Sequence, residues 1–155
     1  MRIELDSTDL QILDLLQTDA SVGQAVVGKR VGLSTAAVNR RIRRLTDAGV
    51  ITRTSAVLDG ELLGHAITLV VQIEVESEQP ELLSATEAAL SADARVQQCY
   101  YVTGEADFIV VVVVQSMSEY TELTKQLFFS NNNVKKFKTF VVMRSSKASL
   151  NIPLV

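Results

Sequence analysis

The apolar positions in the first fifty residues recur at helical spacing. Leucines three residues apart follow Asp6, a residue type that caps helices, and predict a helix over residues 7–17. A second helix is expected over about residues 23–31. A third should begin after Ser34 and end before Gly49, because glycine commonly terminates a helix. Three helices with a short turn before the third are typical of a helix-turn-helix.

Beyond the third helix the pattern changes from helical to alternating. Over residues 50–58 successive side chains fall into two alternating sets, as on the two faces of a strand. This pattern predicts a short β-ribbon wing that continues into a hinge strand. The remaining elements are expected in this order: a strand (67–75), a helix (80–90), two strands (96–103 and 107–114), a helix (117–129) and a strand (134–144). A β-α-β-β-α-β order predicts a ferredoxin-like unit, with both helices on one face of an antiparallel sheet.

The predicted fold class is therefore α+β, with two domains. Residues 1–60 would form the winged helix-turn-helix with its hinge strand, and residues 61–155 the ferredoxin-like domain. The turn residues Asp59 and Gly60 mark the boundary.

One predicted strand is apolar at every position: residues 108–114 read FIVVVVV. Helices can cover only one face of such a sheet, so the other face needs a second apolar cover. We expect another copy of the chain to supply it, in an obligate homodimer. The alternative is a long strand that tolerates valine on an exposed face.

Composition excludes several classes of protein. Apolar residues make up 47% of the 155 positions, enough for a sizeable core. There is no apolar run of about 18 residues and no charged segment before an apolar stretch, so we expect a cytoplasmic protein without membrane contact. Cys99 and His65 are each the only residue of their type, and there is no Gly-rich phosphate loop. We therefore expect no metal, no cofactor and no catalytic residues.

Charge is distributed unevenly along this acidic chain. The net charge is −3, yet residues 29–53 carry seven basic side chains and one acidic side chain. A concentrated positive block in an acidic protein is typical of a surface that binds a polyanion. A solvated helix face is the alternative.

The spacing within the third helix favours DNA. Val38, Ile42 and Leu45 form its apolar stripe, and at 100° per residue Arg40 and Arg43 project from the opposite side. Arginine and asparagine read guanine and adenine in the major groove, and small residues let a helix approach the bases. The candidate contacts to double-stranded DNA are Ser34, Thr35, Ala36, Asn39, Arg40, Arg41, Arg43, Arg44 and Arg53.

Four stretches then match a known family in order: LDSTDLQILDLLQTDA, KRVGLSTAAVNRRIRRLTDAGVI, VTGEADFIVVV and KTFVVM. The chain resembles the Lrp/AsnC (feast/famine) transcriptional regulators over nearly its whole length. The resemblance implies a DNA-binding domain joined by a hinge strand to an amino-acid-sensing domain. It also implies dimers that commonly assemble into octamers, and control of amino-acid metabolism genes.

The resemblance further implies an effector site near the turn between the second and third strands, at contacts between dimers. The matching positions are Tyr101, Thr103, Gly104, Ala106 and Asp107, with Thr139 on the last strand a further candidate. Backbone N–H groups of such a turn can bind a carboxylate, and an aspartate can accept from an ammonium group. In the alternative, Gly104 only permits the turn and Asp107 only fixes the hairpin.

Two other functions remain open at this point. Sirohaem decarboxylases resemble the same two-domain fold, although His65 lacks obvious catalytic partners here. A ligand-independent architectural DNA-binding protein is the other alternative. The C-terminal stretch SSKASLNIPLV fits no motif that we can interpret.

Overall fold

The computed structural model describes residues 3–154, which form two compact units. The head unit runs to Val57 and also includes the chain from Lys147 onwards; the sheet unit is Leu58–Ser146. The sequence placed residues 61–155 in a single domain, whereas the structure assigns the C-terminal segment to the head unit. Within residues 3–154, no helix has the length and apolar character needed to cross a membrane.

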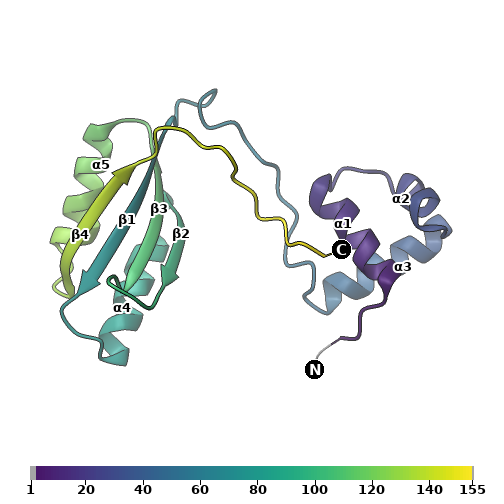
Figure 1. The fold of residues 1–155 in the computed structure, drawn as a ribbon, viewed down its shortest axis with the longest axis horizontal. Helices are drawn as coiled ribbons and strands as arrows, with labels where there is room; N and C mark the ends of the chain where they lie inside the picture. Colours follow the sequence, from purple (N-terminus) through teal and green to yellow (C-terminus); the bar gives the residue numbers. More distant parts are fainter. Residues whose placement is uncertain (1–2, 155) are drawn as a thin grey trace. The chain divides into compact units, whose positions relative to one another are not determined.

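The head unit consists of three helices, shown in Figure 1: α1 (Ser7–Thr18), α2 (Gln24–Val31) and α3 (Thr35–Asp47). Asp6 caps α1, because its carboxylate accepts from the Asp9 N–H at 2.7 Å and the Asp9 carboxylate accepts in return from the Asp6 N–H at 3.2 Å. The Ser34 side chain also caps α3, by accepting from the Ala37 N–H. The three helices predicted from the sequence are confirmed to within one residue or so at each end.

Three fully buried side chains, one from each helix, form the centre of the head unit: Ile12, Val27 and Val38. Gly28 in α2 permits the close packing of the turn before α3. A Cβ atom on Gly28 would lie 2.5 Å from the Leu33 carbonyl oxygen, so even alanine would force the backbone to move.

The predicted wing is not formed within the part of the chain that the structure describes. Residues 50–58 run without helix or strand, and no hydrogen bond joins the backbone of residues 52–58 to another backbone segment among the described residues. Alternation predicted this strand, but a β-strand also needs a partner to accept and donate hydrogen bonds. No segment of the described chain pairs with it.

The sheet unit contains four antiparallel strands in the order β2-β3-β1-β4. The strands are β1 (Ile67–Val75), β2 (Val96–Tyr101), β3 (Phe108–Val114) and β4 (Val134–Val141). Helices α4 (Pro80–Ala92) and α5 (Met117–Leu123) lie together on one face of the sheet (Figure 1). The predicted β-α-β-β-α-β order and α+β class are confirmed.

Some elements were predicted to be longer than they are. β2 ends two residues earlier than expected and β4 three residues earlier. The predicted helix over 117–129 changes character at Thr124, where a π-helical segment (Thr124–Phe129) follows α5. Periodicity fixes the centre of an element better than its ends, where side-chain and backbone caps decide.

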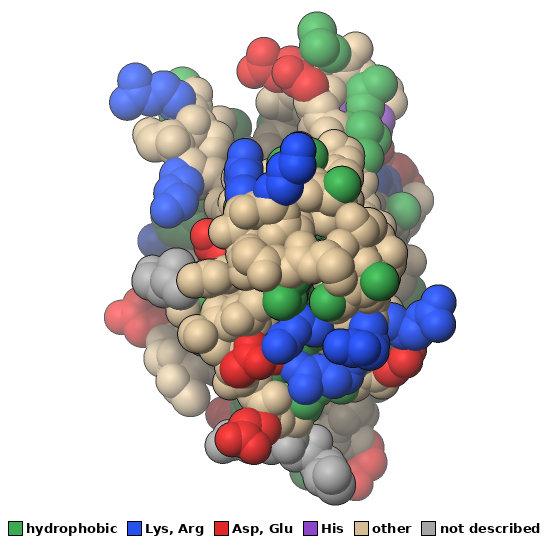
Figure 2. Space-filling view, turned by 90° about the vertical axis from the view of Figure 1, so that its right-hand side faces the viewer, with side chains coloured by type: hydrophobic (Ala, Val, Ile, Leu, Met, Phe, Trp, Pro, Cys, Tyr) green, Lys and Arg blue, Asp and Glu red, His purple; other side chains and the backbone are tan. Residues whose placement is uncertain are grey.

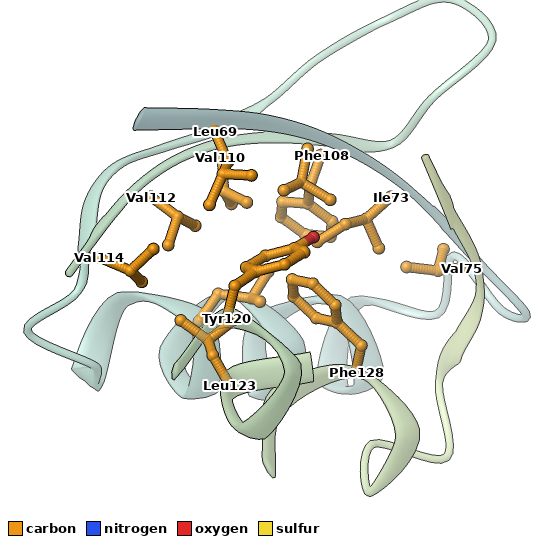
Figure 3. Packing of buried hydrophobic residues seen from close by; sticks show 12 residues of the cluster. Leu69, Ile73, Val75, Phe108, Val110, Val112, Val114, Tyr120, Leu123 and Phe128 are labelled. Carbon is orange, nitrogen blue, oxygen red and sulfur yellow. The ribbon is translucent and has the colours of Figure 1, made fainter. Parts of the chain in front are cut away.

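Alternate residues of the sheet point into the core between sheet and helices. Figure 3 shows side chains such as Val110 and Val112 projecting toward Tyr120, Leu123 and Phe128 from the helical side. Each of these five side chains is at most 6% exposed. The other alternate residues face away from the helices. This second set includes Val70, Ile109, Val111, Val113 and the 42% exposed Phe140.

The C-terminal segment is held on α1 of the head unit. The Gln17 side chain donates to the Ile152 carbonyl oxygen and accepts from the Ile152 N–H, both at 2.9 Å. The same Gln17 amide also donates to the Asp14 carboxylate at 3.0 Å. The segment that fitted no sequence motif is therefore fixed by a side chain 135 residues away.

Candidate nucleic-acid interface and effector turn

Helix α3 presents an exposed basic side to solvent. Arg40 and Arg43 are exposed on the side opposite the buried Val38 and Leu45. Figure 2 views the molecule with the head unit toward the reader, and Lys and Arg side chains gather on that face. Among residues 3–154, no acidic group lies within ion-pair distance of Arg40, Arg43 or Arg53. These three cations are available to a polyanion.

Arg41 and Arg44 are placed differently, because both pair with acidic groups at the start of α1. Arg41 donates to Asp6 and to Asp9 at 2.7 Å each, and Arg44 donates to the other oxygen of Asp9. The Asp9 side chain is fully buried. Asp9 therefore has two cationic partners, and losing both would leave its buried charge unpaired, which typically costs about 3–5 kcal/mol.

The hydrogen bond from Arg41 is also the main cause of a lowered pKa at the Asp6 carboxyl. In turn, hydrogen bonds to Asp6 and then Asp9 raise the pKa of the Arg41 guanidinium. Both groups are therefore held in their charged forms at neutral pH.

The remaining predicted DNA contacts lie at the start of α3 and beyond its end. The Ser34 hydroxyl oxygen accepts a hydrogen bond from the Ala37 N–H at 3.2 Å, within α3 itself. The side chains brought to the exposed surface of the head unit are Ser34, Thr35, Ala36, Asn39, Arg40, Arg43, Arg44 and Arg53, whereas Arg41 is only partly exposed. Their role on DNA stays a prediction.

The turn between β2 and β3 is held by Asp107. Its carboxylate accepts from the Val75 N–H at 2.7 Å, and its own N–H donates to the Ile73 carbonyl at 2.9 Å. Its carbonyl accepts from the Val102 N–H at 2.8 Å. Asp107 thus fixes the hairpin, as the structural alternative expected, and one of its carboxylate oxygens is already used.

The other effector candidates do not all lie together within one chain. Thr103 and Gly104 are exposed in the turn, and Gly104 has a φ of 135°, which favours glycine. The Tyr101 ring packs against the Phe108 ring, with 5.4 Å between the ring centroids. Thr139 is on β4, at the opposite edge of the sheet from the Tyr101 strand, and its hydroxyl is bonded to the Tyr120 hydroxyl at 2.5 Å.

A small hollow lies beside this turn, with a volume of about 100 Å³. It is lined by both cationic and anionic groups, and one such pair, Lys136 and Glu74, is bonded at 2.8 Å. That hydrogen bond is the main cause of the lowered pKa of Glu74. The lining residues are Gln72, Glu74, Glu105, Ala106, Lys136, Phe137 and Lys138.

Sequence reasoning did not anticipate the burial of Asp9 in the first turn of α1. The signal was present, because Asp9, Ile12 and Leu16 follow at spacings of three and four and so share one helix face. An acidic residue on an apolar helix face predicts a buried charge that needs a cationic partner.

Comparisons with known proteins cover both units. Residues 68–152 match the Lrp/AsnC ligand binding domain, and residues 5–52 match a winged helix-turn-helix DNA-binding domain. An uncharacterised HTH-type transcriptional regulator of Sinorhizobium fredii is 34% identical over 152 residues, which is 98% of this chain and 90% of that protein. The leucine-responsive regulatory protein of Haemophilus influenzae is 32% identical over 92% of this chain and 86% of its own length.

Solved structures agree on the fold. An AsnC family transcriptional regulator from Agrobacterium tumefaciens superposes with a TM-score of 0.91 and 29% identity, covering 97% of each chain. A transcriptional regulator of Neisseria meningitidis, solved as a complex with L-methionine, gives the same TM-score and coverage at 23% identity, which shows the fold alone.

Proposed function

Because this chain belongs to the Lrp/AsnC family of transcriptional regulators, we propose that it controls amino-acid metabolism genes as a homodimer that responds to an amino acid. It is a transcriptional regulator and not an enzyme, with a helix-turn-helix that binds DNA and a ligand-binding domain for a small effector. The observation that carries the proposal is the free basic side of α3, set on a chain that also contains the ligand-binding sheet.

On DNA, α3 lies in the major groove with Arg40 and Arg43 toward the bases. Supporting this role, both side chains are exposed, and neither has an acidic partner within residues 3–154. Arg40→Ala and Arg43→Ala should each weaken specific binding by roughly 1–3 kcal/mol. Lys125→Ala removes an exposed charge from the sheet unit and is the matched control. Undiminished binding by the Arg40→Ala/Arg43→Ala double variant would contradict the assignment.

The effector binds at the β2–β3 turn, beside the hollow at Ala106. A zwitterionic amino acid needs a cation and an anion close together, and Lys136 and Glu74 supply both there. Pockets for small molecules usually measure about 300–1,000 Å³, so a 100 Å³ hollow is too small to enclose an effector alone. A second subunit therefore completes the site, which also explains why Thr139 is distant from Tyr101 within one chain.

The homodimer forms through the sheet face that the helices leave open. That face carries a row of apolar side chains across three strands, from Val111 through Val70 to Phe140. Residues 52–58, which pair with no other backbone segment of the described chain, add a second edge that a partner can bond. Dimers then assemble further, and the octamer that is common in the family is the expected end point.

A thermal-shift screen with the twenty amino acids tests the sensor. Leucine and methionine come first, because relatives are named leucine-responsive and one neighbour was solved with L-methionine. A ligand present at a hundred times its Kd adds about 2.7 kcal/mol to the free energy of unfolding and should raise the Tm by about 5–10 °C. D-enantiomers of any hit are the control. If no amino acid raises the Tm, the amino-acid sensor is excluded and only the DNA-binding role stands.

A further inference from the structure

The four arginines of α3 fall into two pairs on different sides of the helix. Arg40 and Arg43 are three residues apart and lie opposite the buried stripe, while Arg41 and Arg44 are also three apart but lie on the flank toward α1. Charge alone does not distinguish the pairs. Their contacts do.

We propose that Arg41 and Arg44 are positioning residues that fix the recognition helix on α1 through Asp6 and Asp9, and that they do not neutralise DNA phosphates. Arg41 bridges both acidic groups at 2.7 Å each, and Arg44 occupies the second oxygen of Asp9. The division rests on the proposed use of the opposite side of α3 on DNA.

The burial of Asp9 makes this division stable when DNA arrives. The Asp9 side chain has no exposed surface, and Arg41 is only 27% exposed against 47% for Arg44. A guanidinium that moved to a phosphate would leave Asp9 in the interior with less neutralising charge. A phosphate contact gains mainly from the release of condensed counterions, and this gain does not offset the loss of charge neutralisation at the buried Asp9 carboxylate.

Fixing α3 in this way sets the direction in which Arg40 and Arg43 point. Asp6 caps α1, and Asp9 completes the capping box, so the ion pairs anchor α3 to a rigid helix end rather than to a mobile side chain. The pairing thus connects the start of α1 to base recognition, although neither acidic group reaches the DNA.

Salt titration separates the two roles, since each phosphate contact contributes about 0.9 to the slope of log K against log salt. The probes are a duplex selected from a random pool by the wild-type protein and a random-sequence duplex of equal length. Arg40→Gln and Arg43→Gln should lower the slope or specific affinity without changing the Tm. Arg41→Gln and Arg44→Gln should each lower the Tm by several degrees, because the buried Asp9 keeps only one cationic partner. Each should leave the slope unchanged and weaken binding to the selected duplex about tenfold.

A double-mutant cycle adds a test on the pair itself. Adding Asp9→Asn to Arg44→Gln removes the buried charge that Arg41 alone would then neutralise, and it should recover part of the lost Tm. Should the Arg41→Gln variant not fold, Arg41→Lys keeps a charge at that position. A slope lowered by about one unit in the folded Arg41 or Arg44 variants would show phosphate contact and overturn the division. Selected-duplex binding that stays at the wild-type level in those variants would overturn positioning. If the Arg40 and Arg43 variants bind normally, the recognition side itself is wrong, which is a different failure.

Discussion

The open face of the four-stranded sheet gives the sharpest test of the proposed dimer, and Val111 lies at its centre. It pairs in register with Val70 on one side and Gln98 on the other, and it points away from the helices. Replacing Val111 by Asp should therefore disrupt assembly while leaving the sheet unit folded. Within a single chain the new carboxylate reaches water, and the loss of β-propensity costs only about 1 kcal/mol.

In a face-to-face dimer the same substitution is far more costly. Each subunit loses a buried valine and gains an unpaired buried charge, which destabilises the dimer by about 3–5 kcal/mol per charge. Because a two-fold dimer contains the substitution in both subunits, this cost applies twice. A total of about 6 kcal/mol or more weakens the dimer at least 10⁴-fold, because every 1.4 kcal/mol is a factor of ten.

Sedimentation velocity at micromolar concentration, with circular dichroism for folding, measures the outcome. Val111→Thr keeps the shape of the side chain without a charge and should remain a dimer. Val112→Asp places the charge on the fully buried helix side and should unfold the sheet unit. A Val111→Asp protein that sediments as a dimer with a native spectrum would refute the open face as the interface.

Three further outcomes are expected. Asp107→Asn keeps an acceptor for the Val75 N–H, so the fold should persist, but effector affinity in calorimetry should fall about ten- to a hundredfold because the negative charge that Asp107 adds to Glu74 near the ammonium group is lost; unchanged affinity would place the site elsewhere. Gln17→Ala removes both hydrogen bonds to the C-terminal segment, at about 0.5–1.5 kcal/mol each, and should speed limited proteolysis of that segment; cleavage at the wild-type rate would contradict the contact. The hydrogen bond from Arg95 holds the pKa of Asp93 below its usual 3.8. Because the pKa of Asp93 is lower in the folded state, its ionised carboxylate stabilises the fold above pH 3.8, and this stabilisation is lost as the pH falls through the folded-state pKa. Asp93→Asn should therefore be about 1 kcal/mol less stable at pH 7 and less sensitive to acid below pH 4 in urea titrations.

The sequence by itself determined the local elements and their order. Capping residues and 3.6-residue periodicity located α1, α2 and α3 to within one residue or so at each end, and alternation located β1 with its full length. The unbroken apolar run of β3 predicted a sheet with apolar side chains on both faces before any strand pairing was known, and Val70 and Val111 do lie on the face away from the helices. These features depend on residues a few positions apart, and that is the distance over which helical and strand patterns act.

The sequence predicted a candidate site on α3 but did not distinguish the contacts that its residues make. The charge block located the basic side of α3, yet it gave all four arginines of that helix the same role. Only the packing of α3 against α1 shows that Arg41 is committed to acidic groups 32 and 35 residues away. Likewise, the motif placed Asp107 in a turn, whereas its bond to Val75 depends on how β1 lies beside β3.

Tertiary structure also decided which segments pair at all. Residues 50–58 have the pattern of a strand, but residues 52–58 remain unpaired within the described chain, while the C-terminal segment has no pattern and is fixed by Gln17 across 135 positions. The physical reason is the same in both cases. A backbone hydrogen bond needs a partner brought close by the packing of the whole chain, and local periodicity contains no information about where that partner lies.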